Sequence, residues 1–100
     1  MNKTIIISAS NAAIEAITEN FKNNKIENFN VSEKRHITGE SASLILAASV
    51  GVQILPTILT FIKDLVKKEP MTLTVGDWKV ENPTPELIEE FLRRSQKENG

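Results

Sequence analysis

The sequence predicts an α+β fold in which helices cover a small sheet. Three observations carry this prediction: a short β-branched run near the start, an alternating hairpin, and three stretches whose apolar residues follow helical spacing. We expect the order β-α-β-α-β-β-α, with a small mixed or antiparallel sheet and the helices on one face. The expected elements are strand 4–8, helix 11–23, strand 27–37, helix 41–68, hairpin 71–81 and helix 85–95.

Composition narrows the class of protein. One hundred residues suit a single domain, so we take 1–100 as one unit with a frayed tail at 96–100. The formal net charge is −1, which gives no electrostatic argument for nucleic acid. The chain has no cysteine, which excludes disulfides and thiolate metal sites. No apolar leader precedes the first strand, so we expect a cytoplasmic protein.

The first unit is a strand followed by a helix. The β-branched run Thr4–Ser8 is typical of a strand buried on both faces. Ser10 is a candidate N-cap for the helix 11–23. The expected buried stripe of that helix consists of Ala13, Ile14, Ile17 and Phe21. The next expected strand, 27–37, is weaker, because Phe29 and Val31 alternate with asparagines and only one face is apolar.

The stretch after Glu40 decides most of the functional interpretation. Between Glu40 and Lys63, 22 consecutive residues carry no charge, which is enough to cross a bilayer as a helix or to form a central helix. As a helix over 41–68, the stretch has one polar stripe with three- and four-residue spacing. That stripe consists of Ser49, Gln53, Pro56, Thr60, Lys63 and Lys67. We expect Pro56 to kink the helix on its wet side, and Thr38–Glu40 to turn into it, with Ser41 or Ser43 as cap.

Three interpretations of this helix stay open. It could be a kinked core helix, a membrane segment over 41–62, or a helix buried between subunits. Eight of the 22 residues are Ser, Thr, Gln, Gly or Pro, which argues against a membrane segment, whereas the following lysines would suit a cytoplasmic flank. The small residues 47–51 would allow close approach of two helices. The candidate partner surface consists of Ser49, Gln53, Thr60, Lys63 and Lys67.

The hairpin at 71–81 is the clearest local pattern. Two alternating runs flank Gly76-Asp77, where glycine can supply the positive φ that a two-residue turn requires. The predicted cross-strand pairs are Val75–Trp78 and Leu73–Val80 on the buried face, and Thr74–Lys79 and Thr72–Glu81 on the wet face. The single tryptophan is then a core residue or, beside the turn, a binding anchor.

The last helix has clear signals at its start. Thr84 is the expected N-cap, and Pro85 suits the first helical position because its missing N–H would be unpaired there in any case. The expected buried stripe consists of Leu87, Ile88, Phe91 and Leu92. Acidic residues near the start and basic residues near the end suit the helix dipole.

Patterns that carry chemistry are missing from the sequence. The four glycines are scattered singly, so no phosphate-cradling loop is predicted. The only histidine is His36, which lies among charged residues with no second histidine or any cysteine to complete a metal site. We therefore expect His36 to be dispensable. We also expect no catalytic, cofactor-binding or metal-binding residues, and no enzymatic activity.

From Thr38 onward the pattern resembles a known bacterial module. The matching features are Thr38-Gly39-Glu40, the small residues 47–51, the basic helix end 61–68, the hairpin 72–77 and the helix 86–92. Together they resemble the effector-associated constant component, first type, of NTP-dependent conflict systems. The resemblance covers about two-thirds of the chain and rests on a structural pattern, so no functional residues carry over.

The resemblance implies a non-enzymatic adaptor of bacterial immunity that needs no cofactor. Such an adaptor would link a sensor or NTPase component to an effector, for example a caspase-like or trypsin-like protease, by protein–protein contact. Homo-oligomers are compatible with this role, and nucleic acid is not expected. The alternative from the residues alone is a membrane-associating effector or anchor that uses the apolar helix 41–62.

Overall fold

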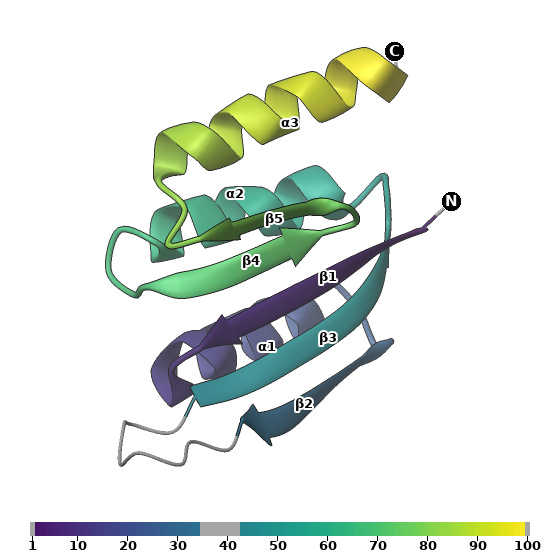
Figure 1. Ribbon diagram of the computed structural model, residues 1–100. Helices are drawn as coiled ribbons and strands as arrows, with labels where there is room; N and C mark the ends of the chain where they lie inside the picture. The colour runs from purple at the N-terminus through teal and green to yellow at the C-terminus, as the bar shows by residue number, and fades with distance from the viewer. Residues whose placement is uncertain (1, 35–42, 100) are drawn as a thin grey trace.

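The chain folds as a five-stranded antiparallel sheet with three helices, so the predicted α+β class is confirmed (Figure 1). The computed structural model describes residues 2–34 and 43–99. The elements are β1 (Asn2–Ala9), α1 (Asn11–Asn23), β2 (Phe29–Lys34), β3 (Ser43–Gly51), α2 (Leu55–Leu65), β4 (Met71–Val75), β5 (Trp78–Glu81) and α3 (Pro85–Asn99). The predicted elements occur in the predicted order, with β3 as an additional strand ahead of α2.

The strand order is β2-β3-β1-β4-β5, and every neighbouring pair is antiparallel. The first six elements form two interleaved β-α-β units: β3 lies between β1 and β2 of the first unit, and β1 lies between β3 and β4 of the second. This is the ferredoxin-like arrangement. The β5 strand and α3 extend it at one edge.

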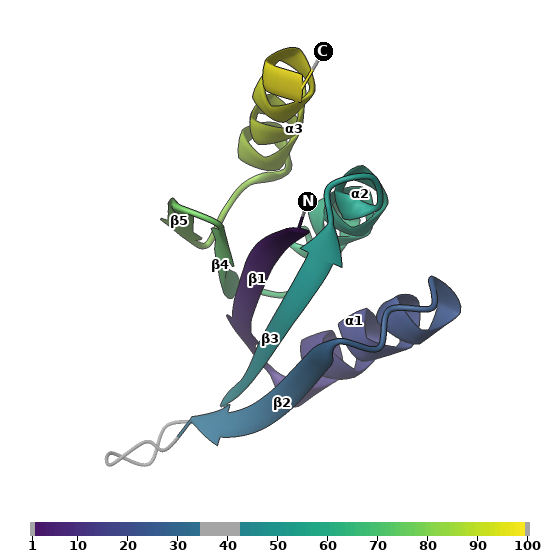
Figure 2. The same ribbon diagram turned by 90° about the vertical axis from the view of Figure 1, so that its right-hand side faces the viewer.

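One face of the sheet holds the core. Ile5 and Ile7 of β1 are fully buried, as are Leu46 of β3 and Leu73 of β4 in the same pleat. We call this the inner face. Figure 2 shows α1 and α2 on the same side of the sheet, against the inner face. Ile17 of α1 and the α2 residues Ile58, Leu59 and Ile62 have no exposed area.

The predicted helix over 41–68 is wrong in its first half. Residues 43–51 form β3, which pairs with β1 on one side and β2 on the other, and the helix begins only at Leu55. The 22 uncharged residues are therefore not one continuous helix, so the apolar helix 41–62 on which the membrane-anchor alternative was based does not form. Within the described ranges, no helix combines the length and apolar character that a bilayer crossing needs.

Pro56 lies at the start of the helix and does not kink it. It lies in the first turn of α2, where Thr57 N and Ile58 N donate to Ile54 O at 3.1 and 3.2 Å. The first-turn N–H groups of a helix lack intrahelical partners, so proline costs nothing there. Ser43 is a strand residue and not a cap, whereas Ser41, His36 and the turn Thr38–Glu40 lie outside the described residues.

The start of α1 matches the prediction. The helix runs over Asn11–Asn23, and Ser10 Oγ accepts a hydrogen bond from Ala13 N at 3.3 Å. The same hydroxyl donates to Glu69 Oε2 at 3.1 Å, which ties the cap to the loop before β4.

In β1, however, only one face is buried: Ile6 is 40% exposed, so the predicted burial on both faces is wrong.

The hairpin register is confirmed in full. Val75 pairs with Trp78 and Thr74 with Lys79, Val75 is buried, Lys79 is exposed, and Gly76 has φ +59°. The cap of α3 is confirmed too, because Thr84 Oγ1 accepts from Leu87 N at 3.2 Å. The helix continues to Asn99, past the point where fraying was expected.

Candidate functional site

The five residues of the predicted partner surface do not lie together. Ser49 is on β3, Gln53 is in the turn after it, Thr60 and Lys63 are on α2, and Lys67 follows the end of α2. All five are more exposed than the buried α2 residues, which confirms the exposure predicted for the first four of them. Thr60 and Lys63 share α2, but Ser49 and Gln53 lie outside it, so the five residues form no single helical stripe.

The face of the sheet opposite the core is a better candidate. In strands β1, β3 and β4, the side chains that alternate with the buried ones point away from α1 and α2. We call this the outer face. Its central residues are Thr4, Ile6 and Ser8 on β1, Ile45, Ala47 and Ser49 on β3, and Thr72 and Thr74 on β4. None of these eight side chains is charged.

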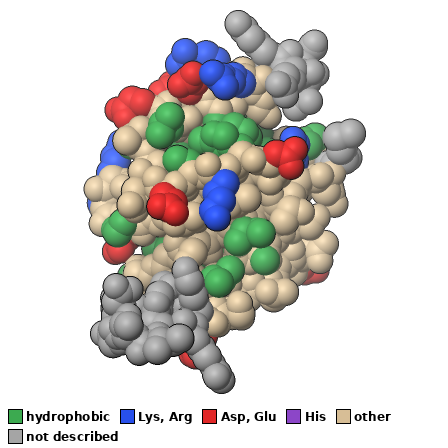
Figure 3. Space-filling view, viewed as in Figure 1, with side chains coloured by type: hydrophobic (Ala, Val, Ile, Leu, Met, Phe, Trp, Pro, Cys, Tyr) green, Lys and Arg blue, Asp and Glu red, His purple; other side chains and the backbone are tan. Residues whose placement is uncertain are grey.

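No described element covers the outer face (Figures 1 and 2). Figure 3 looks onto it: hydrophobic and uncharged atoms lie over β1 and β3, and the charged side chains lie mainly higher, toward β5 and α3. Lys79 and Glu81 on β5 bound it at that edge. Ile6, with 40% of its area exposed, lies near the centre beside Ala47 and Thr74.

An open face of an antiparallel sheet normally carries polar and charged residues, because it faces water. Here the centre combines isoleucine and alanine with the hydroxyl groups of threonine and serine. Such a face can bury against another uncharged surface without desolvating a charge, and scattered hydroxyls can find partners across the contact. In β1 the sequence does show this alternation, because Thr4, Ile6 and Ser8 alternate with the core residues. The run of β-branched residues was instead interpreted as a strand buried on both faces.

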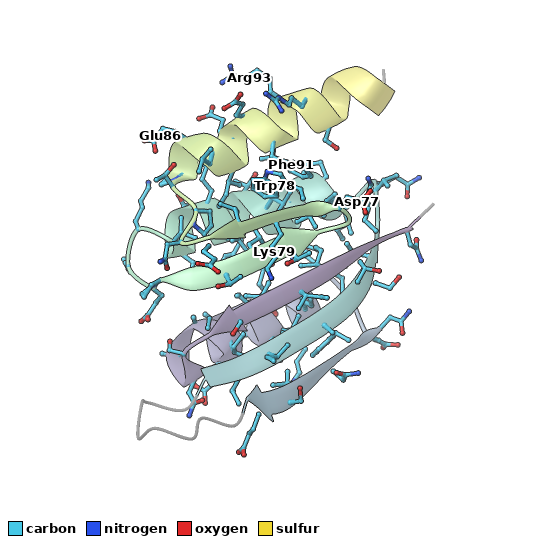
Figure 4. The ribbon with its side chains drawn as sticks, in the orientation of Figure 1. Asp77, Trp78, Lys79, Glu86, Phe91 and Arg93 are labelled. Atoms are coloured by element: carbon cyan, nitrogen blue, oxygen red, sulfur yellow. The ribbon has the colours of Figure 1, made fainter. Side chains whose placement is uncertain are left out.

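A second apolar feature lies between β5 and α3. The rings of Trp78 and Phe91 are stacked, with centroids 4.4 Å apart and planes 15° from parallel (Figure 4). With Leu87, Glu90 and Arg94 they line a shallow hollow of about 150 Å³. Trp78 is thus half-buried against α3 and serves to hold the helix to the sheet.

Two further hollows are present. One, of about 340 Å³, lies between the loops 66–70 and 82–85 and includes Lys67, Lys68 and Thr84. The other, of about 540 Å³, lies between α1 and the strands β2 and β3, with Ile14, Val31 and Leu44 among its lining residues. Among the described residues, no three His, Asp or Glu side chains are grouped to hold a metal ion.

Comparisons with known proteins agree on the fold alone. No family model matches the sequence, and no curated protein matches it significantly. Solved structures do match in three dimensions. A nitrogen regulatory PII-like protein, CPII from Thiomonas intermedia K12, aligns with a TM-score of 0.63 at 16% identity, over 82% of this chain and 94% of that one. It was solved with ADP, AMP and bicarbonate bound.

Two other solved proteins share the fold. A putative PII-like signaling protein from Thermus thermophilus gives a TM-score of 0.64 at 16% identity, over 80% of this chain and 88% of that one. A DUF3240 family protein from Shewanella baltica gives 0.61 at 11% identity, over 77% and 89%. The chain therefore has the fold of PII-like proteins.

Proposed function

We propose that this chain is a small non-enzymatic regulatory module that associates with further copies of itself through the outer face and acts by contact with a protein partner. The observation that carries the proposal is the uncharged centre of that face, which no described element covers. The fold that the chain shares with a nitrogen regulatory PII-like protein and a PII-like signaling protein supports a regulatory module over an enzyme.

A second copy is the occupant that this face fits best. Two identical uncharged faces can meet without placing like charges against each other, and Lys79 and Glu81 at the border can pair with their counterparts at the rim. The face also has isoleucine at its centre and charge at its border, which is the usual anatomy of a protein–protein contact.

The test is the molar mass in solution, measured by light scattering after size exclusion. We expect the wild-type chain to elute as a multiple of the chain mass, and Ala47→Arg on the outer face to elute as a monomer. Thr57→Arg, on an exposed position of α2, is the matched control and should keep the wild-type mass. A monomeric wild-type chain over the whole accessible concentration range would contradict the proposal.

Nucleotide binding is not part of the proposal. The Thiomonas protein holds ADP and AMP, but the present chain has only single, scattered glycines and none in the loop 66–70. Lys67 in that loop lies 3.5 Å from Asp64, so part of its charge is already balanced. The N–H groups of Lys68 and Glu69 in this loop already donate to Leu65 O, at 3.0 Å each, so they are not free to bind a phosphate.

The finer role that we propose is an adaptor in a bacterial conflict system. It rests on the residue pattern from Thr38 onward, although the small residues 47–51 of that pattern lie in β3 and not in a helix. Affinity capture of the tagged chain from its native host tests this role. Recovery of a protease or an NTPase with the wild type, but not with Ala47→Arg, would support it, and recovery of neither would contradict it.

A further inference from the structure

We propose that the free edge of β2, together with the groove beside α1, binds an extended peptide segment that adds to the sheet as a sixth strand. The segment carries a basic residue two positions before a branched aliphatic residue. This site lies on the opposite side of the sheet from the outer face, so the inference goes beyond the proposed association of copies.

Among the described residues, no strand uses the backbone groups along the outer edge of β2. Within the described part of the chain, β2 pairs only with β3. Ser49 N donates to Asn28 O at 3.0 Å, in the register that pairs Phe29 with Ala48. Hydrogen-bonded and non-hydrogen-bonded pairs alternate in an antiparallel ladder, so even-numbered β2 residues direct their N–H and C=O groups at β3. Val31 and Glu33 therefore direct theirs away from the sheet, where an added strand could pair with them.

The groove supplies a place for an apolar side chain. Val31 lies opposite Leu46 on the inner side of the sheet, yet 40% of its area is exposed because α1 does not reach over it. Val31, Leu44 and the buried Ile14 contribute apolar surface to a groove of about 540 Å³. A residue paired with Val31 would point its side chain to the same side, over these three residues.

Charge fixes the end of β2 at which the basic residue of the segment binds. The start of α1 lies at the Glu33 end of β2, because Ala9 pairs with Leu44 and Leu44 with Glu33. The end of α1 lies at Phe29, whose ring centroid is 5.4 Å from that of Phe21.

The carboxylates of Glu33 on β2 and Glu15 on the groove rim are thus toward one end, and Lys22 on the rim is toward the other. Glu19, also on the rim, lies between Glu15 and Lys22 along α1. In an antiparallel added strand, a basic residue opposite Glu33 comes two positions before the residue opposite Val31. That order gives the motif basic–any–aliphatic.

A second copy fits this edge less well. If two β2 strands paired around Val31, each Glu33 would lie opposite a Phe29, and the carboxylates of Glu15 and Glu33 would gain no basic partner. A segment of another protein that carries an arginine or lysine can pair with the outward backbone groups of β2 and also with these carboxylates.

The probe is a fluorescent peptide of sequence Ser-Arg-Thr-Ile-Thr-Val-Ser, titrated with the full chain and followed by anisotropy. We expect saturable binding with a Kd of about 100 µM or tighter. N-methylation of the Ile amide, which would face Val31, should weaken binding by about tenfold or more, since it removes a ladder hydrogen bond. N-methylation of the preceding Thr amide, which would point away from the sheet, is the matched control and should weaken it less than about twofold.

Exchanging the charges between the protein and the probe gives a second, independent test of the binding site. Glu33→Arg should weaken binding of the probe by about fivefold to tenfold, and a probe with Glu in place of Arg should recover it. Glu89→Arg on the exposed side of α3 should change nothing. All these positions are exposed, so the variants are expected to fold.

Three results would overturn the inference. They are the absence of saturable binding up to about 1 mM, equal binding of both N-methylated probes, and a wild-type dimer that Val31→Pro converts to a monomer. The last result would assign the edge to a second copy. The first two results leave the mass measurement with Ala47→Arg intact, because peptide binding at this edge does not involve the outer face. The third would also move the proposed association of copies from the outer face to this edge.

Discussion

The two faces of the sheet are made of different residues, although the same strands build both. The inner face presents isoleucine, leucine and valine, and its central side chains have almost no exposed area. The outer face presents threonine, serine and alanine, with Ile6 and Ile45 among them. Over residues 4–9 of β1, and along β3 and β4, both faces are free of charge.

This difference separates two kinds of contact. Large branched side chains fill the space between a sheet and its helices, and each contributes about 1.5–3 kcal/mol when fully buried. Small and hydroxyl side chains give a flatter surface that a second uncharged surface can cover. The inner face is thus a permanent core, whereas the outer face is suited to a contact that forms between chains.

The largest expected effect is on the inner face. Ile7→Ala removes a fully buried side chain between Leu46 and Leu73, and the core can close the cavity only in part. We expect the free energy of unfolding to fall by about 2–5 kcal/mol, measured by urea denaturation. The loss should be the same at every protein concentration. A loss below about 0.5 kcal/mol would place Ile7 outside the core.

A smaller effect is expected where α3 meets the sheet. Phe91→Ala removes the partner of Trp78 in a half-buried stack, and we expect a loss of about 2 kcal/mol in unfolding free energy. Tryptophan fluorescence should also shift to longer wavelength as Trp78 meets water. Glu89→Ala, at an exposed position of the same helix outside the hollow beside Trp78, is the control and should leave the emission unchanged.

The cap of α3 should contribute less again. Thr84→Ala leaves Leu87 N without its side-chain acceptor, and loss of such a cap costs about 1 kcal/mol. Thr84→Ser keeps the hydroxyl and should recover most of the stability. If the alanine and serine variants unfold at the same urea concentration, the hydroxyl does not cap the helix.

The smallest effect on the isolated chain is expected on the outer face. Ile6→Ala removes an isoleucine next to Ile7, but from a position that is 40% exposed. In dilute solution we expect a loss of less than about 1 kcal/mol. At high concentration the loss should grow, because the wild type gains stability from association that the variant lacks. A concentration-independent loss as large as that of Ile7→Ala would remove the distinction between the two faces.

Local signals account for the parts of the fold that the sequence predicts correctly. The β4–β5 register follows from Gly76-Asp77 and the alternation on either side, and α1 follows from Ser10 and a one-sided apolar stripe. Each signal lies within the element itself. No distant residue is needed to interpret them, which is why the predicted pairs and the predicted cap both hold.

The stretch 43–51 could not be assigned in this way. Its apolar run suits a buried strand and a buried helix alike, and the choice depends on β1 and β2, which pair with it from far away in the sequence. The error carried over to the candidate site: Ser49 and Thr60 share a stripe only on one continuous helix. The outer face was missed for the same reason, because three strands from distant parts of the chain form it together.

Thiol accessibility on the outer face tests the central claim most directly. The chain has no cysteine, so Ala47→Cys places a single small probe beside Ile6, and Thr57→Cys on α2 is the exposed control. The rate of reaction with a maleimide dye is measured across a range of protein concentrations. We predict that the Cys at position 47 becomes slower to react as concentration rises while the control stays constant. Equal and constant rates at both positions would contradict the assignment of the outer face as a contact between chains.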